Sequence, residues 1–181
     1  MSAQKWIILD RDGVINEDSD EYVKSAEEWI AIPGSLEAIA RLKQAGYGVA
    51  IATNQSGIGR GLFSFEDFET MCEKMDVMLD QVGGWVDGIF LCPHAPDEGC
   101  HCRKPLPGLF EQIQEAFELN SLEGVPVIGD SLRDLQAGQA MGCTPILVKT
   151  GKGERTLKKG QGLEGVAVYD DLAEAVNALL A

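Results

Sequence analysis

The chain has 181 residues, 45% of them hydrophobic and 24% charged, which is typical of an ordinary soluble globular protein. Its 29 acidic and 15 basic residues give a formal charge of −14, which disfavours nucleic acid and anionic membranes as partners. The length suits a single domain, 1–181, and any anionic ligand would need a site with its own local cations.

The amino-terminal sequence and the cysteines favour a cytoplasmic protein, which we expect to be a monomer. Only four consecutive apolar residues precede Asp10, too few for a signal-peptide core, and no apolar run approaches membrane-spanning length. The five cysteines are an odd number, so we expect thiols or metal ligands instead of a disulfide framework.

Apolar runs alternate with stretches of helical period along the chain. The apolar runs predict strands at 6–9, 48–53, 88–92, 125–130 and 144–149. The periodic stretches predict helices from a Ser35 cap to Gly46, and at 65–82, 109–119, 131–142 and from 170 or 171 to the end. This alternation is typical of βαβ units, so we predict one Rossmann-like α/β domain with a mostly parallel sheet and helices on both faces. The basic, glycine-rich segment 149–165 is predicted to be a solvated loop, the alternative being a phosphate or partner contact.

Two carboxylates follow the first predicted strand in the sequence Asp10-Arg11-Asp12-Gly13. Side chains alternate along an extended chain, so Asp10 and Asp12 should point the same way and Arg11 the other. Open α/β sheets build their ligand sites at the carboxyl ends of strands. Two carboxylates there could bind a divalent cation, or act as nucleophile and acid/base. The alternative is a strand that ends in a common polar turn.

The second predicted strand ends in a polar, glycine-rich stretch, Thr53-Asn54-Gln55-Ser56-Gly57-Ile58-Gly59-Arg60-Gly61. Its hydroxyl, amide and backbone N–H groups could cradle a phosphoryl group, and Arg60 adds a forked donor suited to phosphate. The alternative is a flexible polar loop.

A third carboxylate, Asp130, ends the fourth predicted strand at the same edge of the sheet. It could complete an oxygen-rich Mg²⁺ site with Asp10 and Asp12. Asp134, one helical turn later, is either a supporting partner of that site or an acid that favours the helix dipole.

Three cysteines and both histidines fall within residues 92–102. Four of these residues offer the tetrahedral Cys₃His set typical of structural Zn²⁺: Cys92, His94, Cys100 and Cys102. Unligated thiols are the alternative, and His101, although out of phase with its neighbours, could replace one of them. Arg103 and Lys104 follow directly, so a zinc-clamped loop would aim both cations, Arg103 to grip a phosphate and Lys104 to neutralise phosphoryl charge.

These motifs form an ordered set: Asp-x-Asp-Gly, Thr-Asn, a Lys before a helix, and Gly-Asp-x-x-x-Asp. The set resembles the haloacid dehalogenase (HAD) superfamily of phosphatases over nearly the whole chain. The zinc loop, with Asn54-Gln55-Ser56-Gly57 and Arg60, narrows the resemblance to the heptose-bisphosphate phosphatases of that superfamily, which lack a separate cap domain. The resemblance implies Mg²⁺-dependent removal of the C7 phosphate from a phosphorylated sugar, through an aspartyl phosphate, in ADP-heptose synthesis for lipopolysaccharide.

The resemblance also implies a role for each motif. Asp10 would be the nucleophile and Asp12 the general acid and then base, while Thr53 and Lys104 steady the phosphoryl group. Mg²⁺ would be held by Asp10, Asp130 and the backbone carbonyl of Asp12, and a structural Zn²⁺ by the Cys₃His set. The remaining substrate contacts would come from the segment 18–22, which includes Asp18 and Tyr22, and from Asn54, Gln55, Ser56, Arg60 and Arg103.

Two other functions fit parts of this pattern. Histidinol-phosphate phosphatases share the scaffold and the zinc loop, but the sequence of residues 56–61 favours the heptose enzymes. A non-catalytic module that only senses a phosphorylated ligand should have lost Asp10 or Asp12, and both are present. A phosphatase that acts on many different substrates is an intermediate possibility.

Overall fold

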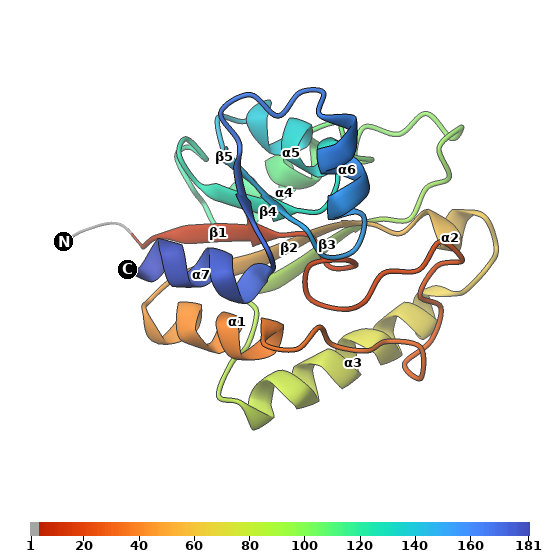
Figure 1. Cartoon of the computed structure of the whole chain (residues 1–181). Coiled ribbons are helices and arrows are strands. Elements are labelled where there is room, and N and C mark those ends of the chain that lie inside the picture. Colours follow the sequence, from red (N-terminus) through yellow and green to blue (C-terminus); the bar gives the residue numbers. More distant parts are fainter. Residues whose placement is uncertain (1–3) are drawn as a thin grey trace.

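The computed structural model describes residues 4–181, and within this range six strands form one sheet in the order β3-β2-β1-β4-β5-β6 (Figure 1). All of the strand pairings are parallel. The strands are β1 (Trp6–Leu9), β2 (Gly48–Asn54), β3 (Gly88–Cys92), β4 (Pro126–Gly129), β5 (Thr144–Val148) and β6 (Ala167–Tyr169). The predicted parallel α/β fold is confirmed.

Helices cover both faces of the sheet, as predicted. In Figure 1, α1, α3 and α7 lie below the sheet, and α4, α5 and α6 lie above it. The helices are α1 (Ser35–Gln44), α2 (Ser56–Gly59), α3 (Phe65–Gln81), α4 (Gly108–Ala116), α5 (Leu132–Gln139), α6 (Gly153–Lys159) and α7 (Leu172–Leu180). The described residues contain no separate cap unit, and no helix among them is long and apolar enough to cross a membrane.

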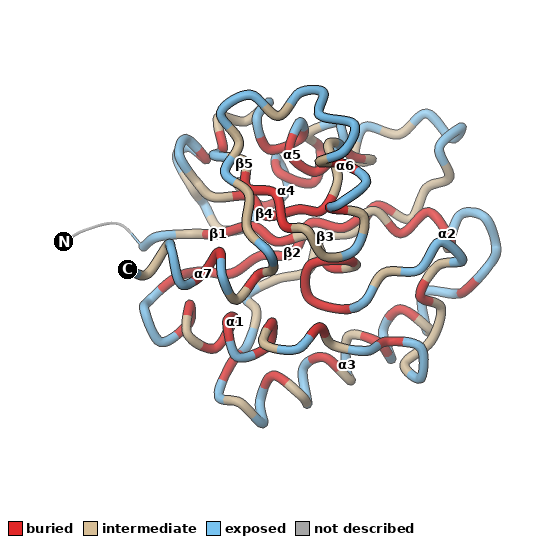
Figure 2. The backbone as a smooth tube through the Cα atoms, viewed as in Figure 1, coloured by how far each residue is buried: buried red, intermediate tan, exposed pale blue. Residues whose placement is uncertain are grey.

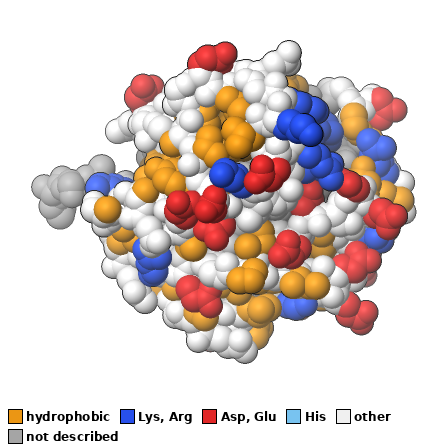
Figure 3. Space-filling view, viewed as in Figure 1, with side chains coloured by type: hydrophobic (Ala, Val, Ile, Leu, Met, Phe, Trp, Pro, Cys, Tyr) orange, Lys and Arg blue, Asp and Glu red, His pale blue; other side chains and the backbone are white. Residues whose placement is uncertain are grey.

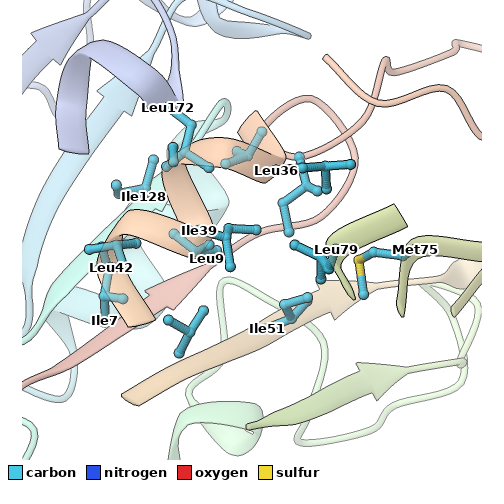
Figure 4. Packing of buried hydrophobic residues seen from close by; sticks show 14 of the residues in the cluster. Ile7, Leu9, Leu36, Ile39, Leu42, Ile51, Met75, Leu79, Ile128 and Leu172 are labelled. Carbon is cyan, nitrogen blue, oxygen red and sulfur yellow. The ribbon is translucent and has the colours of Figure 1, made fainter. Parts of the chain in front are cut away.

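The strands are apolar along their length because both faces of the sheet are buried. Ile7 and Leu9 of β1 pack into the cluster between the sheet and the helices α1, α3 and α7, part of which is shown in Figure 4. Ile8, between them in sequence, packs into the smaller cluster on the opposite face, with Ile113 of α4. Buried residues lie along the central strands and on the inward faces of the helices, while exposed residues lie in the outer loops and on the outer helix faces (Figure 2).

The structure corrects several predictions of local structure. The segment 149–165, predicted as a loop, contains α6, and β6 follows it as a sixth, unpredicted strand of three residues. The stretch after β2 contains the short helix α2. Ser35 is not the N-cap of α1 but its first residue, because its buried hydroxyl donates to the Val14 carbonyl oxygen over 2.9 Å. Gly34, with φ of +87°, occupies the cap position instead.

Candidate active site

The polar strand ends meet in one cavity of about 310 Å³ at the carboxyl edge of the sheet. Parallel strands bring their carboxyl ends to the same edge, so residues far apart in sequence become neighbours. In Figure 3, Lys and Arg side chains gather with acidic neighbours in the upper right of the molecule, the side on which the strands end in Figure 1. The lining includes Asp10, Asp12, Asp18, Tyr22, Asn54, Gln55, Ser56, Arg60, Arg103, Lys104, Asp130, Ser131, Arg133, Asp134 and Lys152.

Three carboxylates of the cavity lie close together, and one buried ammonium group contacts two of them. One oxygen from each of Asp10, Asp130 and Asp134 lies within 4.8 Å of the others. Lys104, which is only 1% exposed, places Nζ 3.0 Å from Asp10 Oδ1 and 2.7 Å from Asp134 Oδ1. Three carboxylates against one ammonium group leave the cluster short of positive charge.

The excess of negative charge shifts the pKa values of the carboxylates in this cluster. Burial and then the Asp134 carboxylate raise the pKa of Asp10 to about 7, although Lys104 opposes this. Burial and the Asp10 carboxylate raise the pKa of Asp130 well above its usual range. Burial also acts to raise the pKa of Asp134, but the Lys104 ammonium outweighs it and the pKa is lowered. A bound divalent cation would relieve the repulsion between these groups.

The shape and chemistry of the cluster fit Mg²⁺, which takes oxygen ligands. Backbone approaches the Asp130 carboxylate closely at Gly13 and Gly151, and a Cβ at either position would collide with its Oδ2. Both glycines also have positive φ, +87° and +57°. The side chain of Asp12 is not part of the cluster, in which Asp134 takes the place that the sequence assigned to Asp12.

The segment 149–165 forms one wall of this site, contrary to the loop prediction. Lys152 N–H donates to Asp130 Oδ2 over 2.9 Å, and the Thr156 hydroxyl donates to the Asp130 carbonyl over 2.8 Å. The Thr150 hydroxyl donates to the Gly13 carbonyl over 2.6 Å. The segment therefore holds both Asp130 and the turn after Asp12 in place through these hydrogen bonds.

Asp12 points into the cavity as expected, and its carboxylate is held by side chains from two elements. Arg11 Nη2 and Asn16 Nδ2 each donate to Asp12 Oδ1 over 2.8 Å, and Gln55 Nε2 donates to Oδ2 over 3.0 Å. Arg11 leaves the cavity as alternation requires, but its guanidinium turns back to Asp12. The alternation of side chains predicts that Arg11 points away from the cavity, but it does not predict the contact between its guanidinium and Asp12.

The polar stretch after β2 divides into buried and cavity-facing residues. Asn54, Gln55, Ser56 and Arg60 line the cavity. Thr53 is buried outside the cavity lining, and its Oγ1 accepts a hydrogen bond from Gln55 Nε2 over 2.9 Å.

The Cys₃His residues lie together next to the cavity. Cys92 Sγ is 3.4 Å from His94 Nδ1 and 3.6 Å from Cys100 Sγ, and Cys102 Sγ is 3.3 Å from His94 Nδ1. Zn–S bonds of about 2.3 Å in a tetrahedron place two sulfurs about 3.8 Å apart, so the four side chains fit one Zn²⁺. His101 is not in the cluster: its side chain is 67% exposed, and Nε2 lies 3.1 Å from Glu111 Oε2.

Besides Lys104, four cationic side chains line the cavity: Arg60, Arg103, Arg133 and Lys152. Arg103 Nη1 is buried and has no hydrogen-bond partner among the described residues. Burial and the neighbouring charges of Arg133 and Arg60 lower the pKa of Arg103. Lys152 Nζ lies 2.8 Å from Asp18 Oδ2 on the opposite rim. Sequence analysis missed Arg133 and Lys152 as site residues, although both follow strand ends at the edge where ligands were expected.

Comparison with known proteins decides the family. The HAD-hydrolase-like family model matches residues 101–175. The chain is 56% identical to D-glycero-beta-D-manno-heptose-1,7-bisphosphate 7-phosphatase of Bordetella bronchiseptica, over 97% of this chain and 98% of that one. It is 53% identical to the enzyme of the same name from Pseudomonas aeruginosa, over 98% and 99% of the two chains. The chain belongs to the D-glycero-beta-D-manno-heptose-1,7-bisphosphate 7-phosphatase family.

Solved structures of heptose-bisphosphate phosphatases share this fold throughout. The B. bronchiseptica D,D-heptose 1,7-bisphosphate phosphatase, solved as a complex with magnesium and phosphate, matches with a TM-score of 0.95 over 97% of this chain and 98% of that one. The corresponding enzyme from Burkholderia thailandensis, 46% identical, matches with a TM-score of 0.76 over 98% and 99% of the chains. The resemblance drawn from the sequence motifs to the heptose-bisphosphate phosphatases and the HAD superfamily is thus confirmed.

Proposed function

We propose that this protein is a Mg²⁺-dependent phosphatase that removes the C7 phosphate of D-glycero-D-manno-heptose 1,7-bisphosphate, in ADP-heptose synthesis for lipopolysaccharide. The observation that carries the proposal is the convergence of Asp10, Asp12, Lys104 and Asp130 on one cavity. The chain has this cavity and is 56% identical to a phosphatase of that name, whose crystal structure holds magnesium and phosphate.

Two carboxylates perform the covalent chemistry in this proposal. Asp10 attacks phosphorus and forms an aspartyl phosphate, while Asp12 gives a proton to the departing sugar oxygen. Asp12 then takes a proton from the water that hydrolyses the aspartyl phosphate. Lys104, held by Asp134, neutralises charge on the transferred phosphoryl group, and Thr53 steadies the loop that carries Gln55.

Metal ions have two separate roles. Asp10, Asp130 and the backbone carbonyl of Asp12 hold Mg²⁺, which when bound offsets the negative charge shared by the phosphoryl group and the carboxylates. The Cys₃His set holds a structural Zn²⁺, because four protein ligands leave no open position. The zinc site fixes the residues immediately before Arg103 and Lys104.

The cations at the mouth recognise the rest of the substrate. A bisphosphate carries a second phosphate that does not react, and Arg60, Arg103, Arg133 and Lys152 supply charge and forked donors for it. Asp18 and Tyr22 on the facing loop, with Asn54, Gln55 and Ser56, supply hydrogen bonds for sugar hydroxyls. We further propose that residues 1–181 act as a single domain, which the one continuous sheet supports. We also propose that the protein is a cytoplasmic monomer.

The test is Mg²⁺-dependent phosphate release from both anomers of the heptose 1,7-bisphosphate and from histidinol phosphate, with Asp10→Asn as the control. We expect clear preference for one heptose anomer and loss of turnover in Asp10→Asn. Preference for histidinol phosphate would move the enzyme to histidine synthesis. No release from any substrate would support the non-catalytic binding module, and substantial turnover in Asp10→Asn would refute the covalent mechanism.

A further inference from the structure

The two oxygens of Asp12 have different surroundings. Oδ1 accepts three hydrogen bonds: from Arg11 Nη2 over 2.8 Å, from Arg11 Nε over 3.2 Å and from Asn16 Nδ2 over 2.8 Å. Oδ2 accepts one, from Gln55 Nε2 over 3.0 Å. The side chain is 21% exposed and lines the cavity. The three hydrogen bonds to Oδ1 occupy all of its lone pairs, so a further hydrogen bond or a proton can be accepted only by Oδ2.

The side chain of Arg11 is held in place by the residues packed around it and does not enter the cavity. It is 1% exposed, and its guanidinium carbon lies 5.1 Å from the centre of the Phe68 ring. Nη1 contacts Met71 Sδ at 3.9 Å, so α3 packs against the guanidinium. Among the described residues its carboxylate partner is Asp12, and a buried guanidinium that loses its carboxylate is strongly destabilising.

The side-chain amide of Asn16 points its nitrogen toward Asp12, which leaves its own carbonyl oxygen without a hydrogen bond within residues 4–181. Its Nδ2 donates to Asp12 Oδ1 over 2.8 Å and to the Glu17 carbonyl over 3.1 Å. Its Oδ1 is buried and has no hydrogen-bond partner within residues 4–181. The flipped amide would set its oxygen against two acceptors, so the orientation follows from Asp12 and Glu17. A buried acceptor left unsatisfied beside a reactive carboxylate calls for an explanation.

We infer that Arg11 and Asn16 are positioning residues that hold Oδ1 of Asp12, so that Oδ2 carries the proton in the reaction. The inference rests on the proposed role of Asp12 as general acid and base. As an Asp10 oxygen bonds to phosphorus, the bond from phosphorus to the sugar oxygen breaks and Oδ2 gives its proton to that oxygen. Water then attacks phosphorus and gives a proton to Oδ2, and the bond to Asp10 breaks, which releases phosphate and restores both side chains.

If Asp12 has this role, its effect on the rate should depend on the leaving group of the substrate. A sugar alkoxide needs a proton as it departs, whereas the nitrophenolate of p-nitrophenyl phosphate leaves without one. The value of kcat/KM reports the steps up to departure of the leaving group, so a misplaced acid lowers it for the sugar and not for the aryl ester.

The experiment measures kcat/KM of the Mg²⁺-loaded enzyme for both substrates in Arg11→Lys, Asn16→Ala and Asp12→Asn. Ser35→Ala is the matched control, because its buried hydroxyl supports the same loop through Val14 without touching Asp12. We expect Arg11→Lys and Asn16→Ala to lose about tenfold or more on the heptose bisphosphate and less than about threefold on p-nitrophenyl phosphate. Ser35→Ala should change both values by the same factor. If Arg11→Lys does not fold, Asn16→Ala alone decides the question.

The outcomes distinguish this inference from the proposed function. Selective loss on the sugar in Asp12→Asn, with equal changes on both substrates in Arg11→Lys and Asn16→Ala, would overturn the positioning role alone. Equal loss on both substrates in Asp12→Asn would overturn the acid role of Asp12, and the inference with it.

Discussion

Asn54 and Lys104, 50 positions apart in the sequence, exchange two hydrogen bonds. The Lys104 N–H donates to Asn54 Oδ1 over 3.0 Å, and Asn54 Nδ2 donates to the Lys104 carbonyl over 3.2 Å. Asn54 ends β2, while Lys104 comes two residues after Cys102 of the Cys₃His set. The position of the buried ammonium group is therefore supported both by the end of a central strand and by the loop that carries the Cys₃His set.

Removing one of these supports should lower turnover more than stability. We expect Asn54→Ala to reduce kcat about tenfold, because a small displacement of Lys104 weakens its contact with the phosphoryl group. The melting temperature should fall only modestly, though more than in Gln114→Ala, which removes one exposed amide-to-backbone hydrogen bond outside the site. Steady-state kinetics and thermal unfolding of both variants test this expectation. An unchanged kcat in Asn54→Ala would contradict the two-sided support of Lys104.

Asp134 combines the two roles considered for it from the sequence. Its carboxylate contacts Lys104 and also accepts from Ser131 in the capping box of α5. We expect Asp134→Ala to lower the free energy of unfolding by about 2 kcal/mol, since it removes a cap and one of the two carboxylates that contact the buried Lys104, which keeps Asp10 as its partner. Asp67→Ala removes the exposed capping box of α3 alone and should cost about 1 kcal/mol. Equal losses in denaturant titrations of the two variants would mean that the pair with Lys104 adds nothing.

Loss of zinc should reduce stability and activity together. Without a metal to join Cys92, His94, Cys100 and Cys102, little apolar packing holds the loop before Arg103, and the aim of Lys104 is lost. We expect Cys100→Ser to lower the zinc content, the melting temperature and kcat, whereas Cys72→Ser, outside the set, should leave the zinc content unchanged. Metal analysis, thermal unfolding and kinetics on the same preparations test this. Full activity in zinc-free protein would rule out the clamp.

Mg²⁺ binding should be coupled to proton release near neutral pH. In the metal-free protein, burial and the Asp134 carboxylate raise the pKa of Asp10 from 3.8 to about 7. A raised folded-state pKa means that protonated Asp10 stabilises the metal-free fold at low pH, and this contribution is lost as pH rises from about 4 towards 7. Mg²⁺ requires the carboxylate, so it should raise the melting temperature more at pH 8 than at pH 5.5.

Calorimetry can count these protons directly. At pH 6.5, titration with Mg²⁺ in two buffers of different ionisation enthalpy should give different apparent heats, and Asp10→Asn should reduce the difference. Identical heats in both buffers, or equal thermal shifts at both pH values, would mean that Asp10 is already ionised in the metal-free protein.

The sequence predicts the floor of the site better than its walls. Asp10, Asp12 and Asp130 can be placed because each follows an apolar run, and parallel strands must end at a common edge. The Cys₃His set can be found because its members are close together in sequence. Lys152 escapes prediction, since its contact with Asp130 depends on where α6 turns back over the sheet and not on a local pattern.

Short elements and helix starts are predicted least well, for a similar reason. β6 has three residues, with Ala167 exposed and the other two only partly buried, and it pairs only with β5, so it carries little periodic signal. Ser35 has the composition of a cap, but a longer-range partner, the Val14 carbonyl, takes its hydroxyl. In both cases tertiary contacts outweigh local preference.

The carboxylate cluster and the Cys₃His set share no residue, and Lys104, two residues after Cys102, contacts Asp10 and Asp134 of the cluster. Soft ions such as Cd²⁺ prefer thiolates, whereas carboxylates suit hard ions such as Mn²⁺. Soft ions would therefore exchange at the Cys₃His set, where excess magnesium would not compete with them. Manganese, in contrast, would exchange at the carboxylates and leave the sulfur site unchanged.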